Sequence, residues 1–199
     1  DIYVIVNVHK EKIIEYYKSI RSDLNSRIHF IEQKRLNGLA NAILLAEKYI
    51  RDEPFLTILG DECIITRSLN PVIEFFYQNK SVVTEVVIKE KSIDILRQTC
   101  SANIGENGRI IEILEKPEKP PYMIRGCGVY VFSPEIFDYI RSTPIHPTRE
   151  EKEITQTIND LAKINKAYGH FIDGENININ DPDELLKASQ LFRKYSPNN

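Results

Sequence analysis

The order of apolar and polar positions along the chain predicts alternating strands and helices. Continuous apolar runs are typical of buried strands, and each of the first three runs is followed by apolar residues at helical spacing. These predicted strand and helix pairs are 2–8 with 10–24, 27–33 with 38–50, and 54–60 with 68–79. The first eighty residues therefore predict repeated βα units, which favour a parallel sheet.

Beyond residue 80 the pattern is richer in strands. Strand-like runs are "SVVTEVVIKE", "TCSANIG", "RIIEILEK", "GCGVYVF", "AYGHFID" and "NININ", with a turn at "GENG". Helices are predicted at 133–140 with Ser133 as N-cap, at 153–165, and at 181–195 with Asp181 as N-cap and Pro182 behind it. We therefore expect an α/β fold, a three-layer α/β/α sandwich with a mostly parallel mixed sheet.

Composition narrows the class of protein. A chain of 199 residues fits one domain, residues 1–199, and 28% charged with 42% hydrophobic residues is ordinary for a globular protein. The net charge of −3 argues against nucleic acid as a partner. No apolar run reaches the roughly 20 residues of a membrane span and no secretory signal opens the chain, so we expect a cytoplasmic protein. The three cysteines are too far apart to suggest a disulfide framework or a zinc site.

Candidate ligand-binding residues lie where predicted strands end. "FLTILGDECII" places Gly60, Asp61 and Glu62 after an apolar strand, and Gln33 follows another one. Ligands of open α/β sheets bind beyond the carboxyl ends of strands, and an aspartate there can hold a divalent cation. A solvated surface turn is the alternative interpretation of Asp61.

Three further stretches combine polar groups or glycines with strand patterns. Glu115 and Lys116 of "EKP" offer an acceptor for hydroxyls and a donor for phosphate, or they are a charged strand end. The glycines of "GCGVY", Gly126 and Gly128, indicate close approach of a ligand or backbone, or a tight packing corner. "NININ" places its three asparagines on one face by strand alternation.

In order along the chain, these segments resemble the sugar nucleotidyltransferase family. The matching stretches are "IEQKRLNGLANAILLAEKYI", "EPFLTILGDECI", "IIEILEKP", "GCGVYVFSPEIFDYI", "KEITQTINDL" and "NININDPDELLKA". The resemblance covers nearly the whole chain. It implies a Rossmann-like nucleotidyltransferase fold and an enzyme that joins a nucleoside triphosphate, UTP or dTTP, to a sugar 1-phosphate with release of pyrophosphate.

The resemblance also implies site residues. Gln33 would read the edge of the base and Gly38 would pack on it, while Asp61 would hold the cofactor Mg²⁺ against the phosphates. Asn178 matches a position where many members carry a second metal-binding aspartate. The sugar phosphate would contact Glu115, Lys116, Gly128 and Glu153, with Asp61 and Lys116 in catalytic roles.

The chain also departs from the family pattern. "DIYVIVNV" resembles the strand that follows the family's Gly-rich loop, so we expect a fold truncated at the N-terminus, a fragment of a longer chain that is inactive alone. The amide of Asn178 weakens the second metal position by one charge. A non-catalytic ligand-sensing or assembly domain is the alternative, and a glycosyltransferase ranks third. The base, the sugar and the oligomeric state, a homo-oligomer included, stay open.

Overall fold

The computed structural model describes residues 1–7, 10–20, 27–50 and 52–195. These residues form two compact units, which are described separately. Unit 1 comprises Asp1–Glu53 and Phe137–Thr157, and unit 2 comprises Pro54–Ile136 and Ile158–Asn199. The assignment of the chain to one domain stays a prediction.

Unit 1 contains a two-stranded parallel sheet, β1 (Ile2–Val6) beside β2 (Ile28–Glu32). Its helices are α1 (Lys10–Ile20), α3 (Leu39–Leu44) and most of α6 (Ile136–Ser142). The predicted strand and helix that begin the chain are present, although residue 8 of that strand and residues 21–24 of that helix lie outside the described residues.

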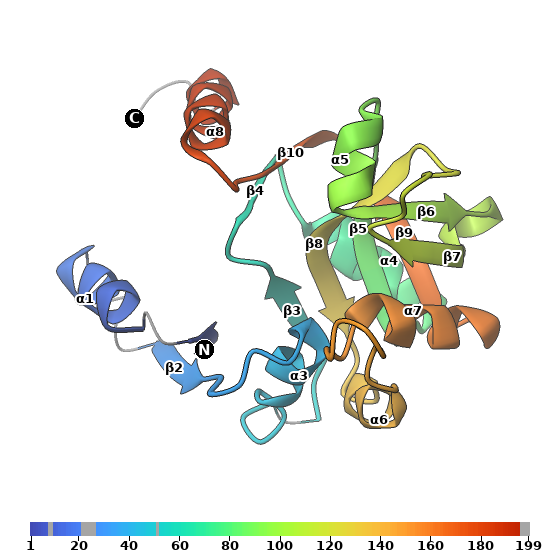
Figure 1. The fold of residues 1–199 in the computed structure, drawn as a ribbon, viewed down its shortest axis with the longest axis horizontal. Helices are drawn as coiled ribbons and strands as arrows, with labels where there is room; N and C mark the ends of the chain where they lie inside the picture. Colours follow the sequence, from blue (N-terminus) through green and yellow to red (C-terminus); the bar gives the residue numbers. More distant parts are fainter. Residues whose placement is uncertain (8–9, 21–26, 51, 196–199) are drawn as a thin grey trace. The chain divides into compact units, whose positions relative to one another are not determined.

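Unit 2 is built on a four-stranded sheet in the order β3-β8-β5-β9 (Figure 1). The strands are β3 (Phe55–Ile58), β8 (Ile124–Phe132), β5 (Val83–Lys89) and β9 (Ala167–Phe171). β8 runs antiparallel to both neighbours while β5 and β9 are parallel, so three of the four strands share one direction. The predicted α/β class with a mixed, mostly parallel sheet is confirmed.

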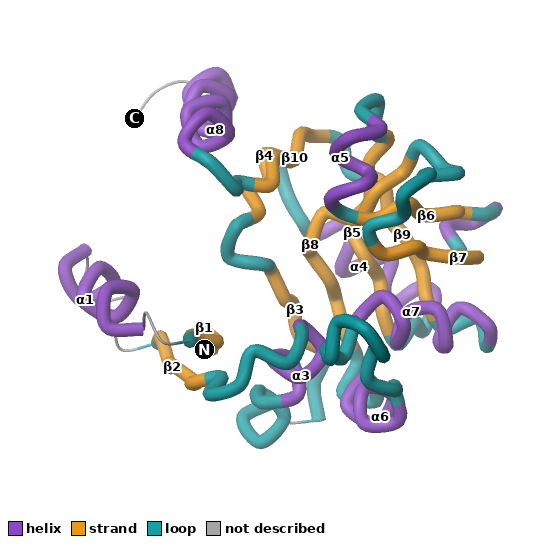
Figure 2. The backbone as a smooth tube through the Cα atoms, in the orientation of Figure 1, coloured by secondary structure: helices purple, strands orange, loops and turns teal. Residues whose placement is uncertain are grey.

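The two faces of this sheet are covered by different elements. Helix α4 (Asn70–Asn79) packs Val72 and Phe76 against Val86 of β5 and against Val129 of β8. On the opposite face lies the hairpin of β6 (Cys100–Ile104) and β7 (Ile110–Glu115), joined by the short helix η1 (Glu106–Gly108) at the predicted turn. Both strands of the hairpin appear beside the sheet in Figure 2.

A second pair of strands positions the polar residues of unit 2. β4 (Glu62–Thr66) pairs antiparallel with β10 (Gly174–Asn178), and α8 (Pro182–Tyr195) follows β10. The predicted cap of α8 is confirmed, because Asp181 Oδ1 accepts the Glu184 N–H at 2.8 Å. The remaining helices are α5 (Ile93–Gln98) and α7 (Ile154–Lys163), which begins in unit 1.

Some local predictions need correction. Strand β4 and helix α5 were not predicted, and α3 ends at Leu44 because the following residues form turns rather than helix. The predicted Ser133 cap is wrong: α6 begins at Ile136, whose N–H bonds the Ser133 carbonyl, and the buried Ser133 hydroxyl has no hydrogen-bond partner. The Ser133 carbonyl accepts the Ile136 N–H in a backbone turn, and this turn takes the place of a side-chain cap.

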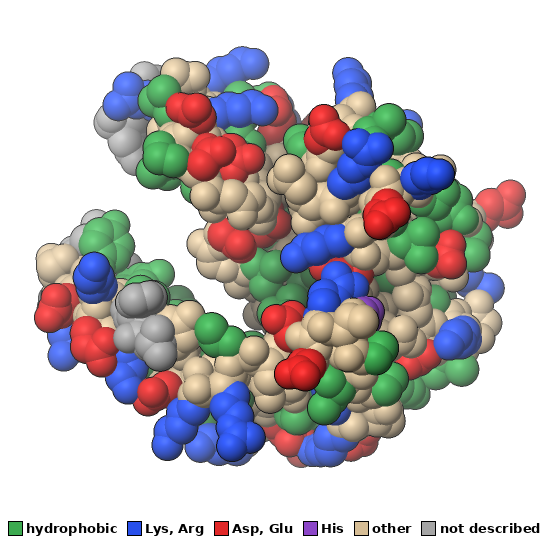
Figure 3. Space-filling view, in the orientation of Figure 1, with side chains coloured by type: hydrophobic (Ala, Val, Ile, Leu, Met, Phe, Trp, Pro, Cys, Tyr) green, Lys and Arg blue, Asp and Glu red, His purple; other side chains and the backbone are tan. Residues whose placement is uncertain are grey.

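Three general findings complete the description of the fold. Within the described part of the chain, no helix is both long and apolar enough to cross a bilayer. The three cysteines are free thiols, with Cys100 and Cys127 buried and Cys63 half-buried. On the face shown in Figure 3, basic and acidic side chains are intermixed over most of the surface.

Candidate functional site

In unit 1, the predicted base-binding residues lie together. Gln33 follows β2, and its Nε2 donates to Asn37 Oδ1 and to the Gly38 carbonyl, both at 3.3 Å. Gly38 has a φ of 104°, and a Cβ there would lie 2.4 Å from the Lys152 carbonyl oxygen. Only glycine fits this backbone position without strain. The structure therefore brings Gln33 and Gly38 into one loop, with the Gln33 amide turned onto that loop.

Glu153 is held close to the same loop. Its neighbour Lys152 bonds the loop twice through its backbone, from its N–H to the Asn37 carbonyl and from its carbonyl to the Ala40 N–H. The Glu153 carboxylate pairs with Arg149 Nε at 2.6 Å and is 14% exposed. Unit 1 thus brings together three predicted residues, Gln33, Gly38 and Glu153.

In unit 2, the Gly60-Asp61 turn joins β3 to β4. Asp61 is exposed, and its backbone carbonyl accepts the Ile179 N–H at 2.7 Å. This bond extends the β4–β10 pairing by one step and places Asp61 beside the end of β10, where Asn178 lies. Asp61 and Asn178, which are 117 residues apart in the sequence, therefore belong to one edge of the unit.

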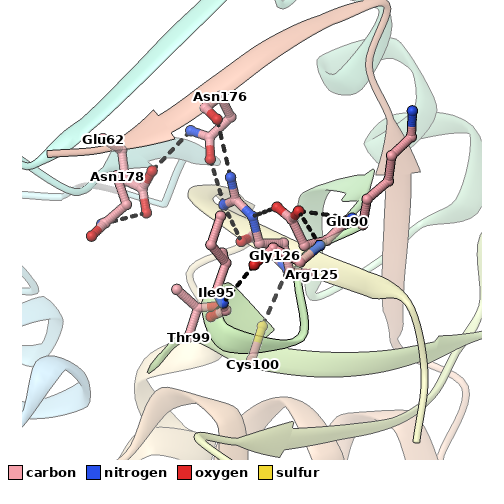
Figure 4. Close-up of polar contacts among 11 residues, drawn as sticks. Glu62, Glu90, Ile95, Thr99, Cys100, Arg125, Gly126, Asn176 and Asn178 are labelled. Atoms are coloured by element: carbon pink, nitrogen blue, oxygen red, sulfur yellow. Dashed lines mark hydrogen bonds and ion pairs between the residues drawn. The ribbon is translucent and has the colours of Figure 1, made fainter. Parts of the chain in front are cut away.

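Glu62 is the centre of a polar network that the sequence did not reveal (Figure 4). Its carboxylate accepts Asn176 Nδ2 at 2.8 Å and Asn178 Nδ2 at 2.9 Å. Asn180 Nδ2 in turn donates to Asn178 Oδ1, so the three amides share one side of the segment as predicted. Burial raises the pKa of Glu62, and the hydrogen bonds from the two amides oppose that rise.

Arg125 of β8 connects this network to β5. Arg125 is 2% exposed. Its guanidinium donates to Asn176 Oδ1 at 2.5 Å and to the Asn176 carbonyl at 3.0 Å. Its Nε bonds Glu90 Oε2 at 3.0 Å. Burial alone would raise the pKa of Glu90, but hydrogen bonds from the Ser92 N–H and from Arg125 hold it below its usual range. A hollow of about 820 Å³ is lined by Arg125, Asn176 and Asn178 among others.

Glu115 and Lys116 lie where β7 ends. Glu115 pairs in register with Cys100, and the Lys116 N–H bonds the Thr99 carbonyl at 2.8 Å. Lys116 is exposed and has a φ of 45°, a left-handed conformation that is uncommon for a residue other than glycine. The structure therefore keeps the two residues adjacent at the end of the hairpin.

Side chains occupy the space beside both glycines of β8, Gly126 and Gly128. A Cβ on Gly126 would lie 1.8 Å from Glu85 Oε1. Gly128 has a φ of 62°, and a Cβ there would lie 2.8 Å from Glu62 Cγ and 2.8 Å from Leu59 Cδ1. Tight packing therefore accounts for glycine at both positions, and the contact of Gly128 with the sugar stays a prediction.

The carboxylate beside Gly126 is itself unusual. Glu85 is 2% exposed, and its Oε2 has no hydrogen-bond partner. Burial raises its pKa to about 8. A charged carboxylate without full hydrogen bonding is costly in an apolar interior, so the neutral acid is the favoured form at neutral pH.

Oxygen donors for a cation are present at the β4–β10 edge. The donors are the Asp61 carboxylate and the Asn178 amide oxygen. Mg²⁺ prefers oxygen ligands of this kind, and it usually keeps several of its water molecules when it binds a protein. Among the described residues no cluster of three or more His, Cys, Asp or Glu side chains surrounds a possible metal position. The residues therefore fit a cation that shares its coordination with water and substrate, not one enclosed by protein.

Two residues of this site, Glu85 and Arg125, were missed from the sequence, and Glu62 was singled out beside Asp61 without its partners. Each sits in or next to an apolar strand run, "ECII", "VVTEVVI" and "IRGCGVYVF". A charged residue inside such a run is costly to bury unless it finds a partner, and that was the available signal. The identity of the partners was not available, because they come from other strands.

Comparison of this sequence with known proteins shows the family to which the chain belongs. The family model described as nucleotidyl transferase matches residues 1–193. Methanocaldococcus jannaschii "Bifunctional protein GlmU" is 32% identical over 192 residues, which cover 96% of this chain and 43% of that protein. Haloferax volcanii "UTP--glucose-1-phosphate uridylyltransferase AglF" is 29% identical over 96% of this chain and 76% of its own length. The chain thus spans less than half of the GlmU relative.

The solved structures agree on the fold. A Bacillus anthracis crystal structure named as a glucose-1-phosphate thymidylyltransferase superposes with a TM-score of 0.83 at 24% identity. The match covers 100% of this chain and 78% of that one. The family model, the relatives and the fold lead to the same conclusion: the chain belongs to the nucleotidyl transferase family, among the sugar nucleotidyltransferases.

Proposed function

We propose that this chain carries the substrate-binding core of an enzyme that transfers a nucleotidyl group from UTP or dTTP to a sugar 1-phosphate. The observation that carries the proposal is the β4–β10 pairing, which places Asp61 next to Asn178 in a chain of this family. The name of the relative AglF, a UTP–glucose-1-phosphate uridylyltransferase, supports glucose 1-phosphate as the first sugar to test.

The proposed reaction is one displacement at phosphorus. An oxygen of the sugar 1-phosphate forms a bond to the α-phosphorus of the triphosphate, and the bond from that phosphorus to the bridging oxygen of the β-phosphate breaks. Pyrophosphate leaves with the bonding electron pair. Little covalent chemistry falls to the protein, so positioning and charge neutralisation supply most of the rate.

The residues of unit 1 serve recognition in this proposal. The Gln33 amide offers a donor and an acceptor, which suit the edge of uracil or thymine alike. Gly38 lets the base approach the loop backbone. Glu153, held by Arg149, accepts hydroxyls of the sugar.

The residues of unit 2 serve the phosphates and the sugar. Lys116 donates to the sugar phosphate, and Glu115 with the backbone at Gly128 contacts the sugar. Asp61 and Asn178 hold Mg²⁺, which would neutralise phosphate charge when bound. Asp61 and Lys116 thereby carry the catalytic roles.

We expect the 199 residues alone to give no turnover, since the match covers 76% of the length of the relative AglF. The test measures Mg²⁺-dependent pyrophosphate release from UTP or dTTP with glucose 1-phosphate. It compares this chain with the protein made from the whole parent reading frame. In that longer protein, Asp61→Asn should lower kcat at least a hundredfold.

A matched control is Asp94→Asn, an exposed carboxylate paired with Arg97 on α5, which should keep the activity of the parent. Turnover by the 199 residues alone would contradict the expected inactivity. Silence of the longer protein with several sugars and triphosphates would contradict the enzyme and favour a non-catalytic ligand-sensing domain.

A further inference from the structure

The network around Glu62 fixes the orientation of two amides. A carboxylate only accepts hydrogen bonds, whereas an asparagine amide has a donating and an accepting end. Because Glu62 receives the nitrogens of Asn176 and Asn178, both amide oxygens must face away from it. Turning either amide over would set its oxygen against a carboxylate oxygen and lose a charge-assisted bond.

The two amide oxygens have different partners. Asn176 Oδ1 accepts from the buried Arg125, which also donates to Glu90, to the Asn176 carbonyl and to the Gly126 carbonyl (Figure 4). Asn178 Oδ1 accepts from Asn180, an exposed neutral amide. A cation can displace a neutral exposed donor at small cost, but it cannot displace a buried guanidinium without leaving that charge unpaired. The oxygen of Asn178 is therefore the exchangeable one.

The strand register explains why this orientation is rigid. Glu62 and Asn178 are register partners on β4 and β10, and Asn176 lies two residues earlier on the same face of β10. Arg125 binds the side chain and the backbone of Asn176 and so anchors β10 to β8. The Glu62 carboxylate thus faces two amides whose backbones are both fixed.

We infer that Glu62 is a positioning residue, which turns the Asn178 amide so that its oxygen, and not its nitrogen, is presented beside Asp61 to a divalent cation. This inference rests on the proposed metal role of Asp61 and Asn178. In this role Glu62 acts through Asn178 and does not itself need to contact the metal.

The test titrates this chain with Mn²⁺ and follows bound metal by water-proton relaxation, a readout that does not require turnover. Four variants are compared with the wild type: Glu62→Gln, Asn178→Asp, the two together, and Glu74→Gln as a control. Glu74 is an exposed carboxylate on α4, so its substitution changes the charge equally but not the network. Circular dichroism melts establish that each variant is folded.

The positioning role predicts a particular order of affinities. Glu62→Gln should weaken Mn²⁺ binding at least tenfold. A glutamine has one accepting oxygen and one donating NH₂, so it can take the place of the carboxylate for only one of the two amides. Its NH₂ then needs an acceptor, and the Asn178 oxygen would turn towards it and away from the cation. Adding Asn178→Asp should bring affinity back to within about threefold, since the NH₂ of the Glu62→Gln side chain can then donate to a carboxylate that keeps its other oxygen free. Asn178→Asp alone should bind more weakly than the double variant, because two carboxylates then face each other. Glu74→Gln should match the wild type.

Two results would overturn the inference while leaving the metal role intact. One is a Glu62→Gln variant that binds Mn²⁺ with the affinity of the wild type. The other is tighter Mn²⁺ binding by Asn178→Asp alone than by the double variant. That order would mean that the number of negative charges, and not the orientation of the amide, decides the affinity. Absence of Mn²⁺ binding by the wild type would instead contradict the metal role itself, and the inference with it.

Discussion

Glu85 gives this protein a pH-dependent stability that one substitution should remove. The side chain lies inside unit 2, between Gly126 and Tyr130 of β8, with its Oε2 lacking a hydrogen-bond partner. Its pKa is raised to about 8 from the ordinary 4.5, chiefly by burial. Between those two values the folded protein keeps a proton that the unfolded chain releases. The free energy of unfolding therefore falls as the pH rises from about 4.5 to 8 and levels off above 8.

The size of the effect follows from the shift. Each pH unit within that window costs about 1.4 kcal/mol, and allowing for the curved ends of the titration gives a loss of about 3 kcal/mol between pH 5 and pH 8. Glu85→Gln has nearly the same shape and does not titrate. It should resemble the wild type at pH 5 and be more stable by about 3 kcal/mol at pH 8.

The assay is urea unfolding of the wild type and Glu85→Gln at pH 5, 6, 7 and 8, followed by circular dichroism. The quantity of interest is the difference between the two proteins, because other titrating groups contribute alike to both. Glu74→Gln, an exposed substitution of the same kind, should follow the wild type at every pH. A difference between wild type and Glu85→Gln that stays constant from pH 5 to 8 would refute the reasoning.

Two further substitutions test the packing and the ion pair that shape unit 2. Gly128→Ala should cost about 1–3 kcal/mol of unfolding free energy, because φ is 62° and neighbouring side chains occupy the space of the new Cβ. Gly60→Ala, where a Cβ would meet no atom within 4 Å, should change the urea midpoint little, and equal effects at the two sites would contradict this explanation. Arg125→Met should cost about 3–5 kcal/mol, because it leaves the partly buried Glu90 without its ion-pair partner and Asn176 without two donors. Adding Glu90→Gln should recover part of that loss in a double-mutant cycle, and strict additivity would show that the pair is not coupled.

Much of the fold was predictable because its signals are local. Helical spacing and apolar runs gave the βα order of the first eighty residues, and Asp181 before Pro182 gave the start of α8. The alternation of "NININ" predicted three amides on one face, which the bonds of Asn176, Asn178 and Asn180 confirm. The Ser133 cap failed because the Ser133 carbonyl, and not its hydroxyl, accepts the Ile136 N–H in a backbone turn.

The candidate site was predictable only in its list of residues. The resemblance named Gln33, Gly38 and Asp61, and their roles stay predictions. The partners of Glu62 and Arg125, and the place of Glu85 beside Gly126, were not predictable, because each contact joins segments far apart in sequence. Glu62 and Asn176, for example, are separated by 114 positions. Their meeting depends on the β4–β10 register.

The sequence by itself therefore determined the α/β class, the order of most elements and the family, since backbone periodicity and ordered motifs are properties of neighbouring residues. The tertiary structure alone decided that Glu62 faces two asparagines, that Arg125 holds β10 to β8, and that Glu85 fills the space left by Gly126. The physical reason is that a buried charge is stable only beside a specific partner, and which partner it meets is fixed when distant strands pair.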